Sequence, residues 1–209
     1  MIIESKAVPP FYKNGYVINF ENTNETVLID PGDEVDELLE YIRLYKLNPI
    51  YILLTHAHID HLFGVPKAKR ETGAKVCLHP DDIQLYNFAK EQADWFGVWI
   101  EALPKIDIFL LDNKDIVIGK NVISVLHTPG HTPGGVCFLI EKNLFCGDTI
   151  FEESIGRTDL PGGDYNQLIA SIKNKLLILD DDTIIYPGHG LASTIGREKK
   201  QNPFLYDEF

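Results

Sequence analysis

The sequence predicts a mixed α/β (α+β) fold in a single domain, and three observations support this prediction. Apolar runs of strand length alternate with segments whose apolar residues recur at helical spacing. Four of the apolar runs lead directly into a histidine or an aspartate. The 209 residues are 44% hydrophobic and 24% charged, as is typical of a globular chain, and no repeat or low-complexity linker divides them. We therefore expect residues 1–209 to form one domain whose strands end at a common rim.

The first third of the chain is expected to begin with two antiparallel strands. Residues 16–20 and 26–30 are apolar runs, and the polar residues 22–25 between them are typical of a hairpin connection. The Asp-Pro-Gly-Asp sequence at residues 30–33 has the composition of a turn. A helix should follow over residues 35–45, where apolar side chains recur at helical spacing.

The rest of the chain is expected to alternate strands and helices. Residues 50–54 are an uninterrupted apolar run, which predicts a strand buried on both faces. Gly64 and Gly73 bracket a short helix, and residues 81–97 predict a longer one. The other predicted elements are strands at 74–78, 108–111, 122–126, 143–146 and 183–186, and an amphipathic helix at 164–179. Three aromatic residues are interpreted as core rather than as the mouth of a pocket: Trp95, Phe96 and Trp99.

Composition excludes several classes of partner. The formal net charge of -12 disfavours nucleic acid, which requires clustered lysine and arginine, and also disfavours an anionic membrane surface. The sequence shows neither a secretory signal nor an apolar run long enough to cross a bilayer, so a cytoplasmic protein is expected. Because the cysteines are odd in number and lack CxxC spacing, Cys77, Cys137 and Cys146 are predicted to be buried, reduced thiols.

Seven side chains that suit a transition metal lie at the ends of predicted strands. They are His56, His58, Asp60, His61, His131, Asp148 and His189. Neutral imidazole binds transition metals, and carboxylates complete the shell of zinc, iron or manganese. A lone histidine is usually structural, but this set is too large for one tetrahedral ion. We therefore expect two divalent ions, with zinc as the first choice and iron or manganese as alternatives.

Local spacing predicts how these ligands divide. His56 and His58 are two residues apart in an extended segment, so their side chains project to one side and can bind the same ion. Asp60 and His61 follow where the chain turns, which lets them face a neighbouring ion. A turn rich in glycine and proline holds His131 at the rim. The two histidines expected to be non-ligands are His79 and His127.

Together these residues resemble the metallo-β-lactamase superfamily, whose fold is a four-layer αβ/βα sandwich with metals at one edge of the sheets. The resemblance extends from Asp30 to Phe204 and is strongest in the motif Thr55-His56-Ala57-His58-Ile59-Asp60-His61. Residues 145–151, 154–164 and 186–190 are most similar to the short, single-domain branch of the type II glyoxalases, or hydroxyacylglutathione hydrolases. The resemblance implies one ion held by His56, His58 and His131, a second held by Asp60, His61 and His189, and Asp148 bridging both.

The resemblance also implies a reaction, the hydrolysis of a thioester of the S-2-hydroxyacylglutathione kind, such as S-lactoylglutathione. Two ions about 3.5 Å apart lower the pKa of a shared water from about 15.7 to near neutrality, and the metal-bridging hydroxide attacks the carbonyl carbon. In addition to binding metal, Asp60 is expected to orient this nucleophile or to handle its proton. The partner is therefore expected to be a small-molecule acyl-thiol.

The sequence indicates the reaction more clearly than the thiol part of the thioester substrate. Two-domain relatives resemble this chain in the metal domain, but they add a C-terminal helical domain with basic residues for glutathione. Only 20 residues follow His189, so no such domain is expected and another acyl-thiol is an alternative substrate. Arg157 is a candidate for binding a substrate carboxylate, although pairing with Asp159 or Asp164 in its own loop is favoured. The tail offers three further cations, Arg197, Lys199 and Lys200.

Four other functions are considered beside thioester hydrolysis. Iron-dependent persulfide dioxygenases resemble the chain in the same ligands and in the sequence of residues 156–159, but use one iron. A lactonase is a further alternative within the superfamily. A nuclease is disfavoured by the acidic charge balance. A non-catalytic scaffold is disfavoured because such relatives usually lose ligands, whereas this chain keeps all seven.

Overall fold

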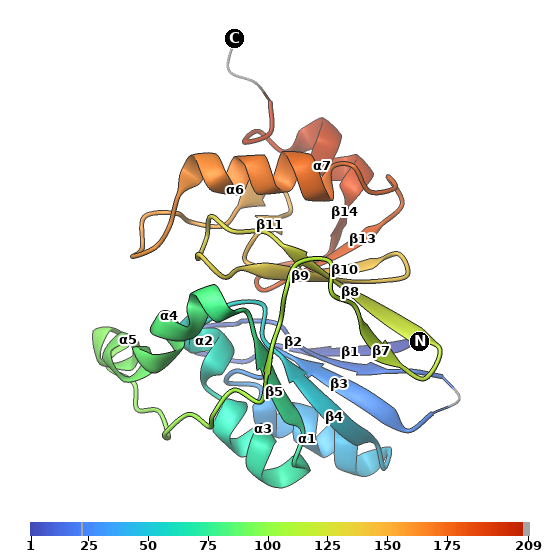
Figure 1. Cartoon of the computed structure of the whole chain (residues 1–209), viewed down its shortest axis with the longest axis vertical. Coiled ribbons are helices and arrows are strands. Elements are labelled where there is room, and N and C mark those ends of the chain that lie inside the picture. Colours follow the sequence, from blue (N-terminus) through green and yellow to red (C-terminus); the bar gives the residue numbers. More distant parts are fainter. Residues whose placement is uncertain (22, 207–209) are drawn as a thin grey trace. The chain divides into compact units, whose positions relative to one another are not determined.

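The computed structural model describes residues 1–21 and 23–206, which divide into two compact units at Leu110. Each unit contains one six-stranded sheet together with its own helices (Figure 1). Asn22, the first residue of the predicted hairpin connection, lies outside the described residues. Among the described residues, no helix combines the length and apolar character that a membrane crossing requires. The grouping of residues 1–209 into one domain stays a prediction.

The sheet of the first unit has the strand order β1-β2-β3-β4-β5-β6. The predicted hairpin is confirmed, because Tyr16 pairs with Ile29 and Asn19 with Thr26 in antiparallel register. From β3 to β6 the strands are parallel, so their carboxyl ends share one edge. The strands are β1 (Ile2–Lys6), β2 (Gly15–Asn19), β3 (Glu25–Ile29), β4 (Asn48–Leu53), β5 (Lys75–Leu78) and β6 (Ile108–Phe109).

Two helices, α1 (Val35–Leu44) and α3 (Val65–Thr72), lie side by side on one face of this sheet (Figure 1). The apolar stripe predicted for the first of them is confirmed, since Leu38 and Leu39 are buried against the strands. Gly73 ends α3 in the left-handed conformation, with φ 72°, as the sequence predicts. A short helix, α2 (Ile59–Leu62), separates β4 from α3.

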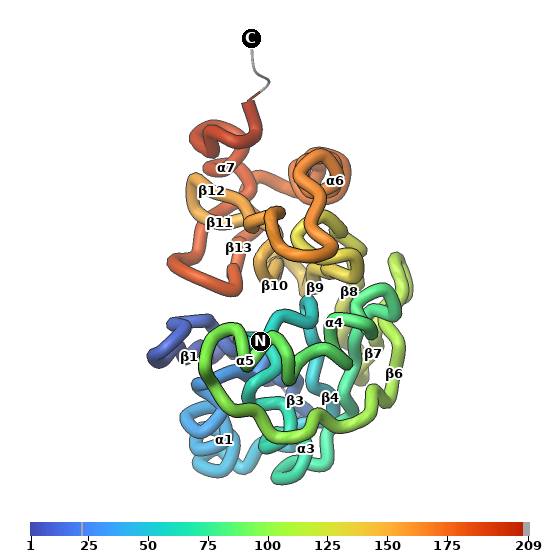
Figure 2. The backbone as a smooth tube through the Cα atoms, turned by 90° about the vertical axis from the view of Figure 1, so that its left-hand side faces the viewer, coloured from blue at the N-terminus to red at the C-terminus, as the bar shows by residue number. Residues whose placement is uncertain are grey.

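The long helix predicted over residues 81–97 forms as three pieces. They are the 3-10 turn η1 (Pro80–Asp82), α4 (Ile83–Asn87) and α5 (Ala89–Phe96), and the chain then runs without helix or strand to β6 (Figure 2). The break between the two α-helices falls at Phe88, whose φ of -94° and ψ of 13° leave the helical region. The core interpretation of Trp95, Phe96 and Trp99 is wrong, because they are 57%, 54% and 75% exposed.

The second unit has the strand order β14-β13-β10-β9-β8-β7. Pairing makes β8, β10 and β13 run in the same direction, so their carboxyl ends lie at one edge of the sheet. The strands are β7 (Ile116–Ile118), β8 (Asn121–His127), β9 (Val136–Ile140), β10 (Asn143–Gly147), β13 (Ile184–Pro187) and β14 (Ser193–Thr194), with a separate pair β11 (Ile150–Phe151) and β12 (Ser154–Ile155).

The amphipathic helix predicted at 164–179 is present as α6 (Tyr165–Ser171), continued by the π-helical turn η2 (Ile172–Leu176). It packs on the sheet through Leu168 and Leu176, which are fully buried. A last helix, α7 (Ile195–Gln201), lies beside the β11 and β12 pair (Figure 2). The contact is polar, because the buried Glu198 accepts a hydrogen bond from the Glu153 amide at 2.8 Å.

The three cysteines are free and buried, as predicted from the sequence. Burial raises the pKa of Cys77 to about 12 and that of Cys137 to about 11, and it raises the pKa of Cys146 as well. The thiols therefore stay protonated at pH 8, where only a thiolate reacts. We expect a thiol-specific disulfide reagent to label none of them in the folded protein and all three in denaturant; a fast-reacting thiol in the native protein would contradict this prediction.

Candidate metal centre

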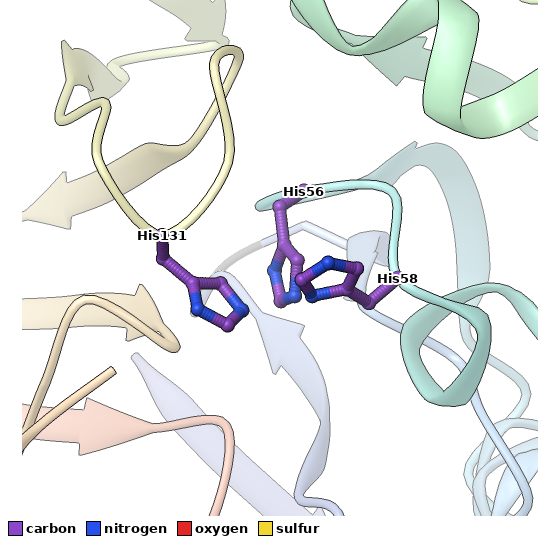
Figure 3. Close-up of side chains that lie close together, drawn as sticks. All are labelled: His56, His58 and His131. Carbon is purple, nitrogen blue, oxygen red and sulfur yellow. The ribbon is translucent and has the colours of Figure 1, made fainter. Parts of the chain in front are cut away.

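The first set of predicted ligands follows β4 in the first unit. His56 and His58 lie on the loop that leaves the strand (Figure 3), and their ring centroids are 4.9 Å apart. One ring nitrogen of His56 lies within 4.8 Å of a ring nitrogen of His58. Asp60 and His61 belong to the first turn of α2, and Asp60 Oδ2 lies 3.6 Å from His61 Nε2. The ring of His61 lies close to that of His56, with the two ring centroids 4.1 Å apart.

A buried carboxylate at the end of β3, Asp30, orients the histidines of this loop. It accepts hydrogen bonds from the Thr55 amide at 2.7 Å, the Thr55 hydroxyl at 2.6 Å and His61 Nδ1 at 2.9 Å. Since the only hydroxyl proton of Thr55 goes to Asp30, Thr55 Oγ1 accepts from His56 Nδ1, 3.1 Å away. Both histidines therefore carry their proton on Nδ1 and offer Nε2 as the metal-binding atom.

The turn that holds Asp30 rests on a buried ion pair that the sequence did not reveal. Lys13 and Glu34 are 1% and 0% exposed, and Lys13 Nζ lies 2.8 Å from Glu34 Oε1. Lys13 also donates to the carbonyl of Asp30, which has a positive φ of 49°. Glu34 accepts from the Gly32 amide at 2.9 Å. The pair thereby fixes the left-handed turn from which the Asp30 carboxylate reaches the histidines.

The same turn packs tightly against the backbone of the metal-binding loop. A Cβ added to Gly32 would lie 2.2 Å from the carbonyl oxygen of Asp60, so only glycine fits there. The pKa of the neighbouring Asp33 is raised to about 6, chiefly by burial and to a lesser extent by the nearby charges of Glu34 and Asp60. The turn is therefore a place where carboxylates are costly to ionise unless they are paired.

The second set of predicted ligands lies at the strand ends of the second unit. His131 sits at the tip of the loop after β8 (Figure 3), Asp148 follows β10 and His189 follows β13. Asp148 Oδ2 lies 3.7 Å from Nε2 of His131 and 3.7 Å from Nε2 of His189. These distances are too long for hydrogen bonds and match ligand atoms that each lie about 2.1 Å from a shared ion. The bridging role expected of Asp148 stays a prediction.

His131 is held by a backbone carbonyl. Its Nδ1 donates to the carbonyl oxygen of Arg157 at 2.7 Å, so Nε2 is again the atom that can bind metal. A Cβ on Gly156 would lie 1.8 Å from the Asp148 carbonyl, which shows how closely this segment packs on the ligands. Sequence reasoning assigned no role to the Arg157 carbonyl.

The Arg157 side chain has a different partner. Its Nε and Nη2 atoms form a bidentate pair with the Asp159 carboxylate, at 2.7 Å each. The guanidinium lowers the pKa of Asp159 to about 2. The favoured interpretation, in which Arg157 pairs within its own loop rather than with substrate, agrees with this contact.

The two histidines expected to be non-ligands have structural contacts. His79 caps η1, since its Nδ1 accepts from the Asp81 amide at 3.3 Å. His127 Nε2 donates to the carbonyl of Pro133 at 2.9 Å, which closes the loop that carries His131. Only the His127 contact lies in the loop that carries a predicted ligand.

The donor atoms fit a transition metal better than calcium or magnesium. Five imidazoles and two carboxylates form a nitrogen-rich set of the kind that zinc, iron and manganese accept, whereas calcium and magnesium prefer all-oxygen sites. Three of the imidazoles have Nδ1 committed to fixed acceptors, as metal-binding histidines usually do. An α/β chain with these donors at its strand ends has the side chains that a transition-metal centre requires.

Comparison with known proteins gives the family. The family model described as the metallo-beta-lactamase superfamily matches residues 8–189, and the chain belongs to this superfamily. It is 42% identical to the hydroxyacylglutathione hydrolase GloC of Haemophilus influenzae over 98% of both chains. It superposes on the crystal structure of the BLEG-1 B3 metallo-beta-lactamase with a TM-score of 0.88 and 38% identity, covering 99% of this chain and 100% of that one. TTHA1623 in a di-iron-bound form matches with a TM-score of 0.87 and 39% identity, covering 97% and 100%.

These relatives confirm the predicted fold class, a mixed α/β fold of the metallo-β-lactamase type, and identify the chain as a metal-binding hydrolase. The relatives are named for different activities, since one is a hydroxyacylglutathione hydrolase and another is a B3 metallo-beta-lactamase.

Proposed function

We propose that the chain hydrolyses thioesters of the S-2-hydroxyacylglutathione kind, such as S-lactoylglutathione, with two divalent ions. The observation that supports this best is the 42% identity to hydroxyacylglutathione hydrolase GloC over nearly the full length of both chains. His56, His58 and His131 would hold one ion, Asp60, His61 and His189 would hold the other, and Asp148 would contribute to both. Zinc is the expected metal, with iron and manganese as alternatives.

The reaction adds water across the thioester and releases a carboxylic acid and a thiol. When bound, the divalent ions supply Lewis acidity that brings the pKa of a water molecule near neutrality and polarises the substrate carbonyl. The chain itself positions the metal-binding atoms. The Nδ1 contacts of His56, His61 and His131 fix the orientation of their Nε2 atoms before a metal ion binds. Asp60 orients the attacking water and accepts its proton. The buried, protonated cysteines cannot serve as nucleophiles.

Three of the four surface cations considered for substrate binding form ion pairs within the chain. Arg157 pairs with Asp159, Arg197 lies 2.9 Å from Glu153, and Lys199 lies 2.6 Å from Asp181. A substrate carboxylate would have to compete with the acidic partners of these solvent-exposed pairs. We therefore propose that selectivity resides in the thioester and its acyl group more than in the carboxylates of glutathione.

The direct test is metal analysis of the purified protein together with a substrate screen. We expect two metal ions per chain, hydrolysis of S-lactoylglutathione or another acyl-thiol, loss of activity with a chelator and recovery on adding metal. The screen should include a β-lactam and lactones, because the superfamily holds other hydrolases. One iron per chain with sulfite release from a persulfide would overturn the proposal in favour of a dioxygenase. Unchanged hydrolysis in Asp60→Ala or His61→Ala would show that the proposed centre is not catalytic.

A further inference from the structure

We infer that Gln92 is a positioning residue for the metal ligand His58, so that loss of its amide weakens one of the two proposed ions and spares the other. The inference rests on the proposed function, and it assigns to α5 a part in the metal centre.

The Gln92 side chain forms hydrogen bonds on both sides of His58. It projects from α5 and is 3% exposed. Its Nε2 donates to the carbonyl of Ala57 at 3.0 Å, and its Oε1 accepts from the amide of Ile59 at 3.1 Å. The backbone immediately before and after His58 is therefore held by a single side chain.

A second side chain completes this support. Asp82 Oδ2 accepts from the amide of Ala57 at 2.9 Å, so both backbone groups of Ala57 are bound by side chains. The other proton of Gln92 Nε2 is donated to the carbonyl of Leu85 at 2.9 Å, which ties the amide to α4. Ala57 and Ile59 are 0% and 1% exposed, so water cannot take the place of these bonds. The loop at His58 is thus anchored on α4, α5 and η1.

Packing alone does not require an amide at this position. An apolar side chain of the same length would fill the space, whereas the amide satisfies the Ala57 carbonyl and the Ile59 amide on either side of His58 and donates its second proton to the Leu85 carbonyl of α4. The three bonds fix where the His58 ring begins, and a shift of a ligand backbone by a fraction of an ångström degrades a metal site.

The effect should be confined to one ion because the other ligands have separate supports. Thr55 holds His56, and Asp30 holds His61. Neither contact involves Gln92. Removing the Gln92 amide should therefore release His58 while leaving the ion at Asp60, His61 and His189 in place.

The experiment measures both metal affinities of Gln92→Met, which keeps the length of the side chain and removes its hydrogen bonds. Competition with a chromophoric zinc chelator, and cobalt(II) titration followed by its visible spectrum, report each ion separately. We expect one ion to bind at least about 10-fold more weakly and the other to be unchanged. Excess metal should restore the second ion and with it the rate of hydrolysis.

Two variants serve as controls. Gln92→Glu keeps an oxygen for the Ile59 amide but turns its other carboxylate oxygen toward the Ala57 and Leu85 carbonyls, and it should weaken the same ion by at least as large a factor. Tyr86→Phe removes a buried hydrogen bond from α4, 2.8 Å to the Pro104 carbonyl, at a place that touches no ligand. It should lower the melting temperature without changing either affinity.

Three results would overturn the inference: two ions bound by Gln92→Met as tightly as by the wild type, equal weakening of both ions, or the same loss in Tyr86→Phe. If Gln92→Met does not fold, the same criteria apply to Gln92→Glu. A wild-type chain that binds no metal would overturn the proposed function and this inference together, whereas unchanged affinities beside a normal wild type would overturn the inference alone.

Discussion

Replacing Lys13 by methionine is expected to lower the free energy of unfolding by about 3 to 5 kcal/mol, because it leaves a buried carboxylate without its cation. Glu34 is 0% exposed and lies 2.8 Å from Lys13, and its remaining hydrogen bond comes from the Gly32 amide. Removing the lysine also removes the donor to the Asp30 carbonyl. Urea unfolding of the metal-free protein measures the effect.

The double variant Lys13→Met with Glu34→Gln tests the cause. It removes both charges and leaves an amide oxygen for the Gly32 amide, so most of the lost stability should return. Lys142→Met is the matched surface control, because Lys142 pairs with Asp182 at 2.6 Å but its side chain is 57% exposed. That change should cost less than about 1 kcal/mol. If the single Lys13 variant is as stable as the surface control, the proposed role of the buried pair is wrong.

Replacing Asp30 by asparagine is expected to weaken metal binding by about 10- to 100-fold and to lower kcat/KM accordingly. The carboxylate accepts three hydrogen bonds from Thr55 and His61, whereas an amide must turn its NH2 group toward one of those donors. Asparagine tolerates the positive φ of this position, so the change tests the hydrogen bonds and not the turn. Metal competition and steady-state kinetics measure the effect.

Asp33→Asn is the matched control, since it removes a carboxylate from the same turn without touching an imidazole. The pKa of Asp33 is raised to about 6 in the folded protein, so stability is lost as the pH rises from about 4, where the unfolded carboxyl ionises, to about 6. This variant should therefore bind metal normally and be more stable than the wild type above pH 6, with no gain below pH 4. Equal metal binding by Asp30→Asn and Asp33→Asn would show that Asp30 does not orient the ligands.

The elements with strong apolar periodicity could be predicted from the sequence, and those stabilised by tertiary contacts could not. The hairpin at residues 16–30 was predicted correctly because its strands are apolar runs buried on both faces, and the helix from Val35 because it buries one apolar stripe. Strand β1 was missed since an edge strand with Glu4 and Lys6 has no apolar alternation. Helix α7 was missed because it is mostly charged, and its fully buried Glu198 contacts loop backbone instead of apolar side chains.

The same distinction applies to the candidate metal centre. Spacing and residue type were enough to propose the seven ligands, because each follows an apolar strand and few other roles require so many histidines. The supporting residues carry no such signal. Gln92 is 35 residues from Ala57, and Asp30 is 31 residues from His61, so nothing local relates them.

The sequence by itself determined the chemistry of this protein: the donor types, their place at the ends of strands and the superfamily to which they belong. Tertiary structure alone decided which ring nitrogen of each supported histidine faces a metal, and that the indole of Trp99 is exposed rather than buried. The reason is physical. Ligand identity depends on the residue type at a position, whereas protonation, orientation and burial depend on buried partners that only folding brings within hydrogen-bond distance.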